Sequence, residues 1–399
     1  MDQSTSITSS PHSIPQSPFE ERLSAELAVL EEKGNLRSLP HIEQNGIYMG
    51  NGTEQMYNLS SNDYLGLATD IALRADFLSG QSAETFLPSA SSSRLLTGNF
   101  PSHRRLEQML ARLYGREAAL VASSGYHINS GILPAIAHER MLILADKLVH
   151  ASLIDGIRLS AARCIRFRHN DYEQLERLIH THSDAYESIL IVTESIFSMD
   201  GDEADLPRLA ALKKKYPNLL LYVDEAHAFG IRGKNGLGCA EEKGCVQEID
   251  FLVGTLGKAL ASAGAFVVCS RLIYQYLVNK MRPLIFTTAL PPWQMDWTCF
   301  LLERLPCFAD RREILRQHAT HLRKVLEEKG YACPSTSHII PVMVGESTAA
   351  ARLARELQKK GLYVLPVRPP TVPEGTSRIR ISLTAALPTD ALNRLIEAL

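Results

Sequence analysis

The chain has 399 residues, enough to bury a large core and to form two or three domains. Its 42 Lys and Arg nearly balance 44 Asp and Glu, so no global field favours nucleic acid or an anionic membrane as a partner. Seven Cys without a CxxC pair argue against a disulfide framework or a zinc site and predict a reduced, cytoplasmic location. No apolar run approaches the ~20 residues that a membrane helix requires.

The N-terminal segment changes character after its first eighteen residues. Residues 1–18 are polar and rich in Ser, Thr and Pro, which predicts a disordered leader. An amphipathic helix is predicted next, ended by Gly34, because apolar residues recur at helical spacing: Phe19, Leu23, Leu27 and Leu30. This helix begins an N-terminal arm over 19–59. Arg37 lies just beyond the helix and, taken alone, reads as a solvated surface charge.

Strand and helix patterns alternate over a predicted large domain at 60–290. The apolar runs that read as strands lie at 141–145, 164–167, 189–192, 219–223 and 249–253. Strands separated by helical segments predict an α/β fold with a largely parallel sheet covered by helices on both faces. Pro291 and Pro292 then mark the start of a smaller α+β domain at 291–399.

Reactive side chains follow two of these strands. Asp224 and His227 follow one strand, and Thr255 and Lys258 follow the next. Ligands of open α/β sheets bind where strands end, so these groups could converge. Lys258 stands between small residues with no acid beside it, which suits an amine that must lose its proton to form a Schiff base. A buried Asp224 could keep a pyridine nitrogen protonated, so the set suits pyridoxal phosphate (PLP).

The same residues allow two other interpretations. A Walker phosphate loop is excluded by spacing, since Gly254 lies three residues before Gly257 and Ala259 follows Lys258. A strand-end Asp and a surface Lys occur in most α/β proteins. These residues alone therefore leave a purely structural role open.

Two loops near predicted helix starts supply further candidates. Gly125 and Tyr126 lie in a strand-to-helix turn, where backbone N–H groups and a glycine make a phosphate cradle. Asn62 lies in SNDYLGL, whose Asn, Asp and Gly residues favour a turn.

The last candidates are two strand-end residues and an arginine pair. His150 and Ser198 each follow a predicted strand, although a lone His is more often structural. Arg378 and Arg380 alternate with isoleucines, so they share one strand face and could hold a carboxylate.

These residues fall in motifs that occur in the same order in the α-oxoamine synthases, which the chain resembles from about Leu36 to its C-terminus. The motifs are SNDYLGL, SGYxxN, HASLxDG, TESIFSMDGD, VDEAHAFG, TLGKA and RPPTVPEGTSRIRISLTA. That family consists of PLP enzymes with the aspartate aminotransferase-like fold (fold type I). Within it the chain is most similar to the branch that forms 8-amino-7-oxononanoate in biotin biosynthesis. The resemblance also implies a homodimer with shared active sites.

The resemblance implies a role for each candidate. Lys258 matches the lysine that forms the Schiff base, Asp224 the partner of the pyridinium nitrogen, and His150 the imidazole between the ring and the substrate. The other matches are cofactor contacts at Gly125, Tyr126, Ser198, His227 and Thr255, and substrate contacts at Arg37, Asn62, Thr371 and Arg380.

The reaction that the resemblance implies is decarboxylative condensation of L-alanine with pimeloyl-CoA or a pimeloyl-carrier protein. Other α-oxoamine synthases stay open as alternatives: glycine C-acetyltransferase, 5-aminolevulinate synthase and a serine palmitoyltransferase-like enzyme. A non-catalytic PLP-fold binding module is a third interpretation, against which the joint retention of Lys258, Asp224, His150 and His227 argues. The Ser-rich SASSSR at 89–94, where relatives often carry a Gly-rich loop, bears on the fit of the acyl chain.

Overall fold

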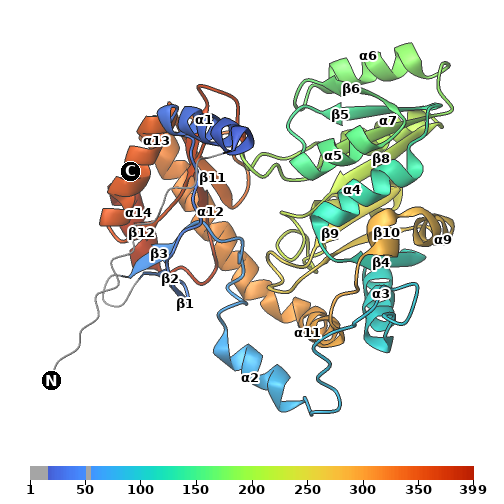
Figure 1. The fold of residues 1–399 in the computed structure, drawn as a ribbon, viewed down its shortest axis with the longest axis horizontal. Helices are drawn as coiled ribbons and strands as arrows, with labels where there is room; N and C mark the ends of the chain where they lie inside the picture. Colours follow the sequence, from blue (N-terminus) through green and yellow to red (C-terminus); the bar gives the residue numbers. More distant parts are fainter. Residues whose placement is uncertain (1–16, 51–54) are drawn as a thin grey trace.

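The computed structural model describes residues 17–50 and 55–399 and has a large domain and a smaller C-terminal domain (Figure 1). The predicted leader lies outside the described residues except for Ser17 and Pro18. Ser17 caps helix α1 (Pro18–Glu32), since its hydroxyl accepts from the N–H of Glu20 while the Glu20 carboxylate accepts from the N–H of Ser17. The predicted helix is present, but none of its residues is buried in the single chain.

A seven-stranded mixed sheet forms the core of the large domain. In spatial order its strands are β4 (Ala118–Ala122), β10 (Ala265–Cys269), β9 (Phe251–Thr255), β8 (Leu219–Asp224), β7 (Ser188–Glu194), β5 (Met141–Asp146) and β6 (Arg163–Phe167). The strands from β9 to β6 run parallel, and β10 is antiparallel to both of its neighbours. The predicted α/β class with a mostly parallel sheet is confirmed, with β10 as the exception.

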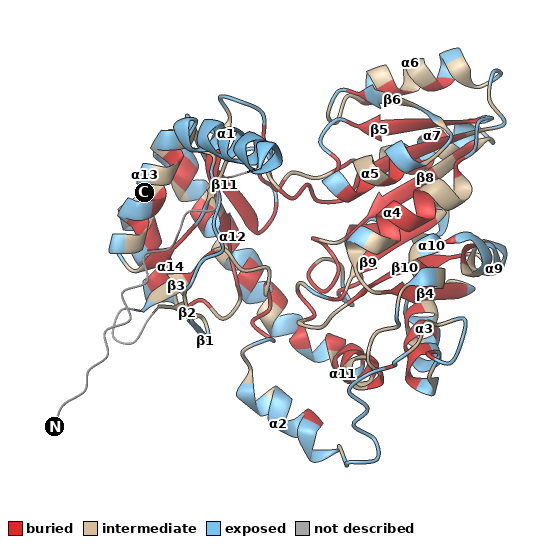
Figure 2. Cartoon of the chain, viewed as in Figure 1, coloured by how far each residue is buried: buried red, intermediate tan, exposed pale blue. Residues whose placement is uncertain are grey.

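Continuous apolar runs in these strands reflect burial on both faces. Figure 2 shows most of the sheet in the buried colour, whereas the outer helices carry exposed faces. The helices of this part are α2 (Ile71–Ser79), α3 (Pro101–Leu113), α4 (Gly125–Ile136), α5 (Ala151–Leu159), α6 (Tyr172–His182), α7 (Leu206–Lys215), α8 (Cys239–Glu242), η1 (Val246–Glu248), α9 (Arg271–Lys280) and α10 (Arg282–Phe286). Helix α4 packs against α5 and α10.

The register of the parallel strands aligns several polar strand ends. Glu194 at the end of β7 lies opposite Asp224 at the end of β8. The strand predicted at 249–253 lies two residues further along, so Thr255 is the last residue of β9 rather than part of the following loop. These ends lie at one edge of the sheet.

Two smaller sheets complete the fold. One has the order β11 (Ile339–Gly345), β14 (Ser377–Ser382), β13 (Pro366–Val367). The other has the order β1 (Gln44–Asn45), β2 (Tyr48–Met49), β3 (Met56–Asn58), β12 (Leu362–Tyr363), and its β12 runs parallel to β3. Strands β12 and β13 are close in sequence but belong to different sheets. The helices here are η2 (Leu305–Phe308), α12 (Ala309–Glu328), α13 (Ser347–Lys359) and α14 (Thr389–Ala398).

Helix α11 (Pro292–Glu303), which follows the predicted proline boundary, packs against α3. Arg105 of α3 forms an ion pair with Asp296 of α11 at 2.7 Å. The exact domain boundaries at 59–60 and 290–291 stay predictions.

Within 17–50 and 55–399, no helix combines the length and the apolar character needed to cross a bilayer. In the same residues no three His, Cys, Asp or Glu side chains are grouped so that they could hold a metal ion.

Candidate active site

A continuous chain of hydrogen bonds runs from Lys258 to Arg380. The Lys258 Nζ lies 2.8 Å from Nε2 of His227, whose Nδ1 lies 2.7 Å from the Tyr64 hydroxyl. That hydroxyl donates to Oδ1 of Asn62 at 2.8 Å, and Nη1 of Arg380 donates to the same oxygen at 3.3 Å. The chain joins the loop after β3, the ends of β8 and β9, and strand β14.

His227 is neutral in this chain. Burial lowers its pKa well below the ordinary value, and the positive charge of Lys258 acts in the same direction. A neutral imidazole has one donor and one acceptor. Because the Tyr64 hydroxyl donates to Asn62, its oxygen accepts from Nδ1–H, which leaves Nε2 as an acceptor toward Lys258.

The amine of Lys258 is activated by its surroundings. Burial lowers its pKa to about 8, although the negative charges of Asp224 and Glu194 oppose this effect. An amine with this pKa has a reactive neutral fraction near physiological pH. Because the charge of Asp224 acts on the amine of Lys258, the two groups belong to one site.

Asp224 is fixed by neutral donors. Its carboxylate is buried, Oδ2 accepts from Nδ2 of Asn129 at 2.7 Å, and Oδ1 accepts from the N–H of Ala226 at 2.9 Å. The Tyr222 hydroxyl donates to Oδ1 of Asn129 at 2.7 Å and so sets the orientation of that amide. Among the described residues, no Lys, Arg or His forms an ion pair with Asp224. A buried carboxylate held in this way fits a cationic ring nitrogen such as that of PLP.

Glu194 and His150 flank Asp224. Burial raises the pKa of Glu194 well above its usual range, and the neighbouring charge of Asp224 adds to the effect. Oε1 of Glu194 accepts from the N–H of His150 at 2.6 Å, which fixes the start of α5. The side chain of His150 is exposed, and its Nδ1 lies 2.8 Å from the Ser152 hydroxyl.

The start of α4 leaves room for an anion. A Cβ added at Gly125 would meet nothing within 4 Å. The start of this 12-residue helix therefore borders open space, which fits the phosphate of PLP, although the N–H of His127 is bonded to the Ser124 hydroxyl. Tyr126 is exposed and donates from its hydroxyl to Asp155 at 2.5 Å. The Thr255 hydroxyl donates to the carbonyl of Gly264 at 3.2 Å.

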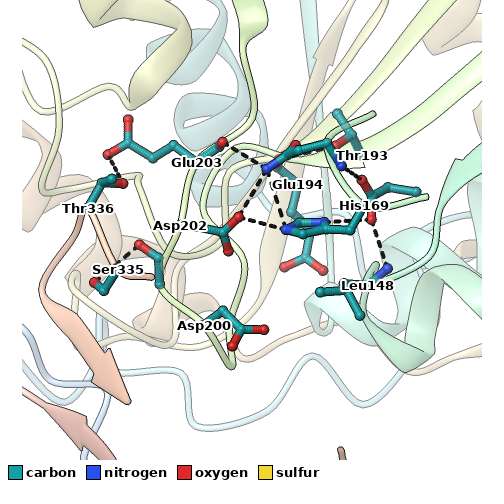
Figure 3. Close-up of polar contacts among 12 residues, drawn as sticks. Leu148, His169, Thr193, Glu194, Asp200, Asp202, Glu203, Ser335 and Thr336 are labelled. Carbon is teal, nitrogen blue, oxygen red and sulfur yellow. Dashed lines mark hydrogen bonds and ion pairs between the residues drawn. The ribbon is translucent and has the colours of Figure 1, made fainter. Parts of the chain in front are cut away.

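The loop after β7, which carries Ser198, is clamped by a charged histidine (Figure 3). His169 lies between two carboxylates, with Nδ1 2.9 Å from Asp146 and Nε2 2.6 Å from Asp202. Burial disfavours the charge on His169, but the hydrogen bonds and charges of the two aspartates raise its pKa to about 10. His169 is therefore protonated at neutral pH and holds the loop in place.

Strand β14 holds the same loop from the other side. Arg380 donates from Nε to the carbonyl of Ser198 at 2.6 Å. Arg378 forms an ion pair with Asp200 of the loop. The carboxylate that Arg378 holds is thus one of the chain's own, whereas Arg380 stays beside Asn62 and the Lys258 chain.

Arg37 and Thr371 meet in a separate contact at the surface. Nη2 of Arg37 donates to the Thr371 hydroxyl at 2.9 Å, although the two residues are 334 positions apart. Both side chains are exposed.

Three further residues that contact the site, Tyr64, Asn129 and Glu194, were not among the candidates predicted from the sequence. Tyr64 and Asn129 could have been found there, since they lie inside the motifs SNDYLGL and SGYxxN. Glu194 lies in TESIFSMDGD, directly after an apolar strand.

Comparisons with known proteins agree with this geometry. The family model "Aminotransferase class I and II" matches residues 54–399. A protein of Glaesserella parasuis, provisionally named 8-amino-7-oxononanoate synthase, is 54% identical over 374 residues, covering 94% of this chain and 98% of its own. A protein of Pasteurella multocida with the same provisional name is 50% identical over 375 residues, covering 94% and 97%.

Two solved structures with the same fold are a serine palmitoyltransferase and an 8-amino-7-oxononanoate synthase. Serine palmitoyltransferase from S. paucimobilis with bound PLP–myriocin is 29% identical, with a TM-score of 0.86 over 96% of this chain and 97% of that one. An 8-amino-7-oxononanoate synthase from Francisella tularensis is 29% identical, with a TM-score of 0.73 over 86% and 96%. The chain therefore belongs to the aminotransferase class I and II family, and within it to the PLP-dependent α-oxoamine synthases.

Proposed function

We propose that the chain condenses L-alanine with a pimeloyl thioester and releases CO2, a free thiol and 8-amino-7-oxononanoate for biotin biosynthesis. The single observation that carries the proposal is the activated amine of Lys258, which shares one site with the buried carboxylate of Asp224. The names of relatives at about 50% identity support this choice of substrates.

PLP bound at Lys258 would supply an electron sink for the pair of electrons left when the substrate loses its Cα proton. Asp224, oriented by Asn129, would hold the ring nitrogen protonated and so maintain that sink. Ser198, His227 and Thr255 would contact the cofactor, and the Gly125–Tyr126 turn would receive its phosphate.

Once the amine of the substrate has displaced it, Lys258 would be the base that takes the Cα proton, since its lowered pKa lets the free amine accept and return a proton near neutral pH. Arg380 and Asn62 bind the carboxylate of the amino acid, a task for which the guanidinium fork is suited. His150 is exposed at the start of α5, where it donates a hydrogen bond to the new ketone oxygen. Arg37 and Thr371 bind the acyl substrate.

The test is amino-acid-dependent release of free thiol from a panel of acyl-CoAs. The proposal expects the highest kcat/KM with L-alanine and pimeloyl-CoA or a pimeloyl-carrier protein. Activity with glycine or serine but none with alanine would overturn the biotin assignment. An absence of any visible cofactor band, or a band that borohydride does not remove, would instead point to the non-catalytic module.

A second candidate is a serine palmitoyltransferase-like reaction. It is favoured by the TM-score of 0.86 to two serine palmitoyltransferases, one of them from Sphingomonas wittichii at 30% identity and 96% coverage of each chain. Thiol release with serine and a long acyl-CoA in the same panel would select it. Glycine with acetyl-CoA or succinyl-CoA would select the other two branches.

We also propose a homodimer with shared active sites. The apolar stripe of α1, with Phe19 at 61% and Leu27 at 52% exposure, supports an interface that covers this helix. Light scattering coupled to size exclusion tests it, and a monomer at micromolar concentration would contradict it.

A further inference from the structure

A cavity of about 600 Å³ lies outside the candidate active site. Its walls are residues 231–234 after β8, one side of α12, and residues 336–338 before β11. None of the residues expected to bind the cofactor or the substrates lines it. Its volume falls within the range of small-molecule sites.

Three cations of this cavity have no carboxylate partner among the described residues: Lys234, Arg312 and Arg323. Arg312 donates to the backbone carbonyls of Leu305 at 2.9 Å and Lys234 at 3.2 Å. Arg323 donates to the carbonyl of Ser337. Carbonyl oxygens thus satisfy donors of the two arginines, and the opposing charges of Glu241 on Arg312 and of Glu203 on Arg323 act without a direct ion pair.

The carboxylates in the wall are already engaged. Glu242 is paired with Arg232 at 2.6 Å, and Glu313 is paired with Arg316 at 2.6 Å. The second partner of Arg232, Glu203, also accepts from the Thr336 hydroxyl at 2.8 Å. The cavity therefore keeps an excess of positive charge.

Burial makes the charge of Arg312 costly. Arg312 is only 8% exposed, and burial lowers the pKa of both Arg312 and Arg323. Buried cations are normally paired with an acid, because an uncompensated charge is strongly disfavoured in a protein interior. Two guanidinium groups and one ammonium group around one space form a typical receptor for a dianion.

We propose that this cavity binds a small metabolite through a phosphate group, with Arg312, Arg323 and Lys234 as its charged contacts. A phosphate dianion matches the excess of cations better than a single carboxylate does. The remaining volume, bordered by Ile231, Leu315 and Ala319, accommodates the organic part of the ligand.

The cavity shares one wall with the active site. His338 lines the cavity, and its ring centroid lies 4.1 Å from that of Tyr64 in an edge-to-face contact. Tyr64 in turn contacts Nδ1 of His227. A ligand that shifts His338 would therefore disturb Tyr64, and through Tyr64 the hydrogen bonds that lead to Lys258.

The test is isothermal titration calorimetry of the PLP-loaded protein with inorganic phosphate, glycerol 3-phosphate and succinate. Arg323→Gln and Arg312→Gln are expected to weaken phosphate or phosphate-ester binding at least tenfold. Lys234→Gln, whose side chain is exposed and whose loss leaves folding intact, is expected to weaken it about threefold. Arg316→Gln is the matched control, because this arginine also lines the cavity but is paired with Glu313.

The outcomes separate the sources of the phosphate. Tighter binding of glycerol 3-phosphate than of inorganic phosphate supports a phosphorylated metabolite, and equal binding supports free phosphate as the ligand. The proposal is overturned if neither binds the wild-type protein at millimolar concentration, if succinate binds as tightly as both, or if Arg323→Gln, Arg312→Gln and Lys234→Gln all bind like Arg316→Gln.

Discussion

His169 and His227 are two shielded histidines that lie in opposite electrostatic environments. His169 is held between two carboxylates, which raise its pKa to about 10. His227 lies between the Lys258 amine and the Tyr64 hydroxyl, and burial together with nearby cations lowers its pKa. Charge is therefore used to fasten the loop that carries Ser198, whereas the imidazole beside the reactive amine is kept neutral so that it can accept a hydrogen bond.

The largest effect is expected from Lys258→Ala, which removes the amine beside the neutral His227. Thiol release should fall about 10⁴-fold or more, because the variant lacks both the covalent anchor for PLP and the base. Lys280→Ala, an exposed change at the end of α9, should stay within about twofold of wild type. Normal turnover in Lys258→Ala would end the assignment.

Removal of the charge on Asp224 should have the next largest effect on activity. Asp224→Asn is expected to lower kcat about 10³-fold, because the electron sink loses its charged partner. It should also lower the pKa of Lys258 below about 8, since the Asp224 charge raises that pKa. Uptake of PLP by the apo protein, which needs the neutral amine, should rise as pH rises through about 8 in wild type and at lower pH in the variant.

Absorbance of the cofactor band against pH measures both curves. The exposed Asp310→Asn is the control and should follow wild type. Identical pH midpoints for Asp224→Asn and wild type would show that the charge of Asp224 does not act on the pKa of Lys258.

His169→Leu tests the role of the charged histidine. Two carboxylates, Asp146 and Asp202, would lose their common cation, at a cost of about 3 kcal/mol in the free energy of unfolding. Thermal unfolding should therefore begin several degrees lower, with the exposed His180→Leu as an unaffected control.

The pH dependence of this contribution has a defined sign. Since folding raises the pKa of His169, its stabilisation is fully present below about 6.5 and is lost as pH rises through about 10. His169→Leu should flatten the stability profile over that window. An unchanged profile would contradict the assigned charge.

The smallest effect is expected from Tyr64→Phe. Nδ1–H of His227 would lose its acceptor, at a cost of about 1 to 2 kcal/mol, so kcat should fall about tenfold. The pH–rate profile should shift as well, which a purely structural change would not cause. Tyr276→Phe, on the exposed side of α9, is the matched control, and equal activities of the two variants would remove Tyr64 from the chain.

Much of the large domain could be predicted from the sequence because its strands are buried on both faces. Their apolar runs are continuous and end in polar residues, so the end of β8 at Asp224 is visible in the sequence. The end of β9 was predicted two residues early, since Gly254 interrupts the apolar pattern although it lies within the strand. For the short strands β12 and β13, nothing local in the sequence indicates that they pair in different sheets.

The contacts within the site were harder to predict from the sequence. Asn129 is bonded to Asp224 across 95 positions, and Tyr64 to His227 across 163. No local periodicity encodes such pairs, which are fixed by packing of α4 and of the loop after β3. The pairing of Arg378 with Asp200 shows the same limit, since the strand pattern gave the shared face of the two arginines but not which carboxylate each would meet.

The parallel pairing of β3 with β12 has a consequence for biosynthesis of the chain. Tyr57 leaves the ribosome long before its partner Leu362 is translated. The seven-stranded sheet, complete by Cys269, can form while the N-terminal arm still waits without its neighbour strand. A nascent chain stalled before β12 would therefore contain the seven-stranded sheet but would lack the strand that pairs with β3 and the later strand that carries Arg380.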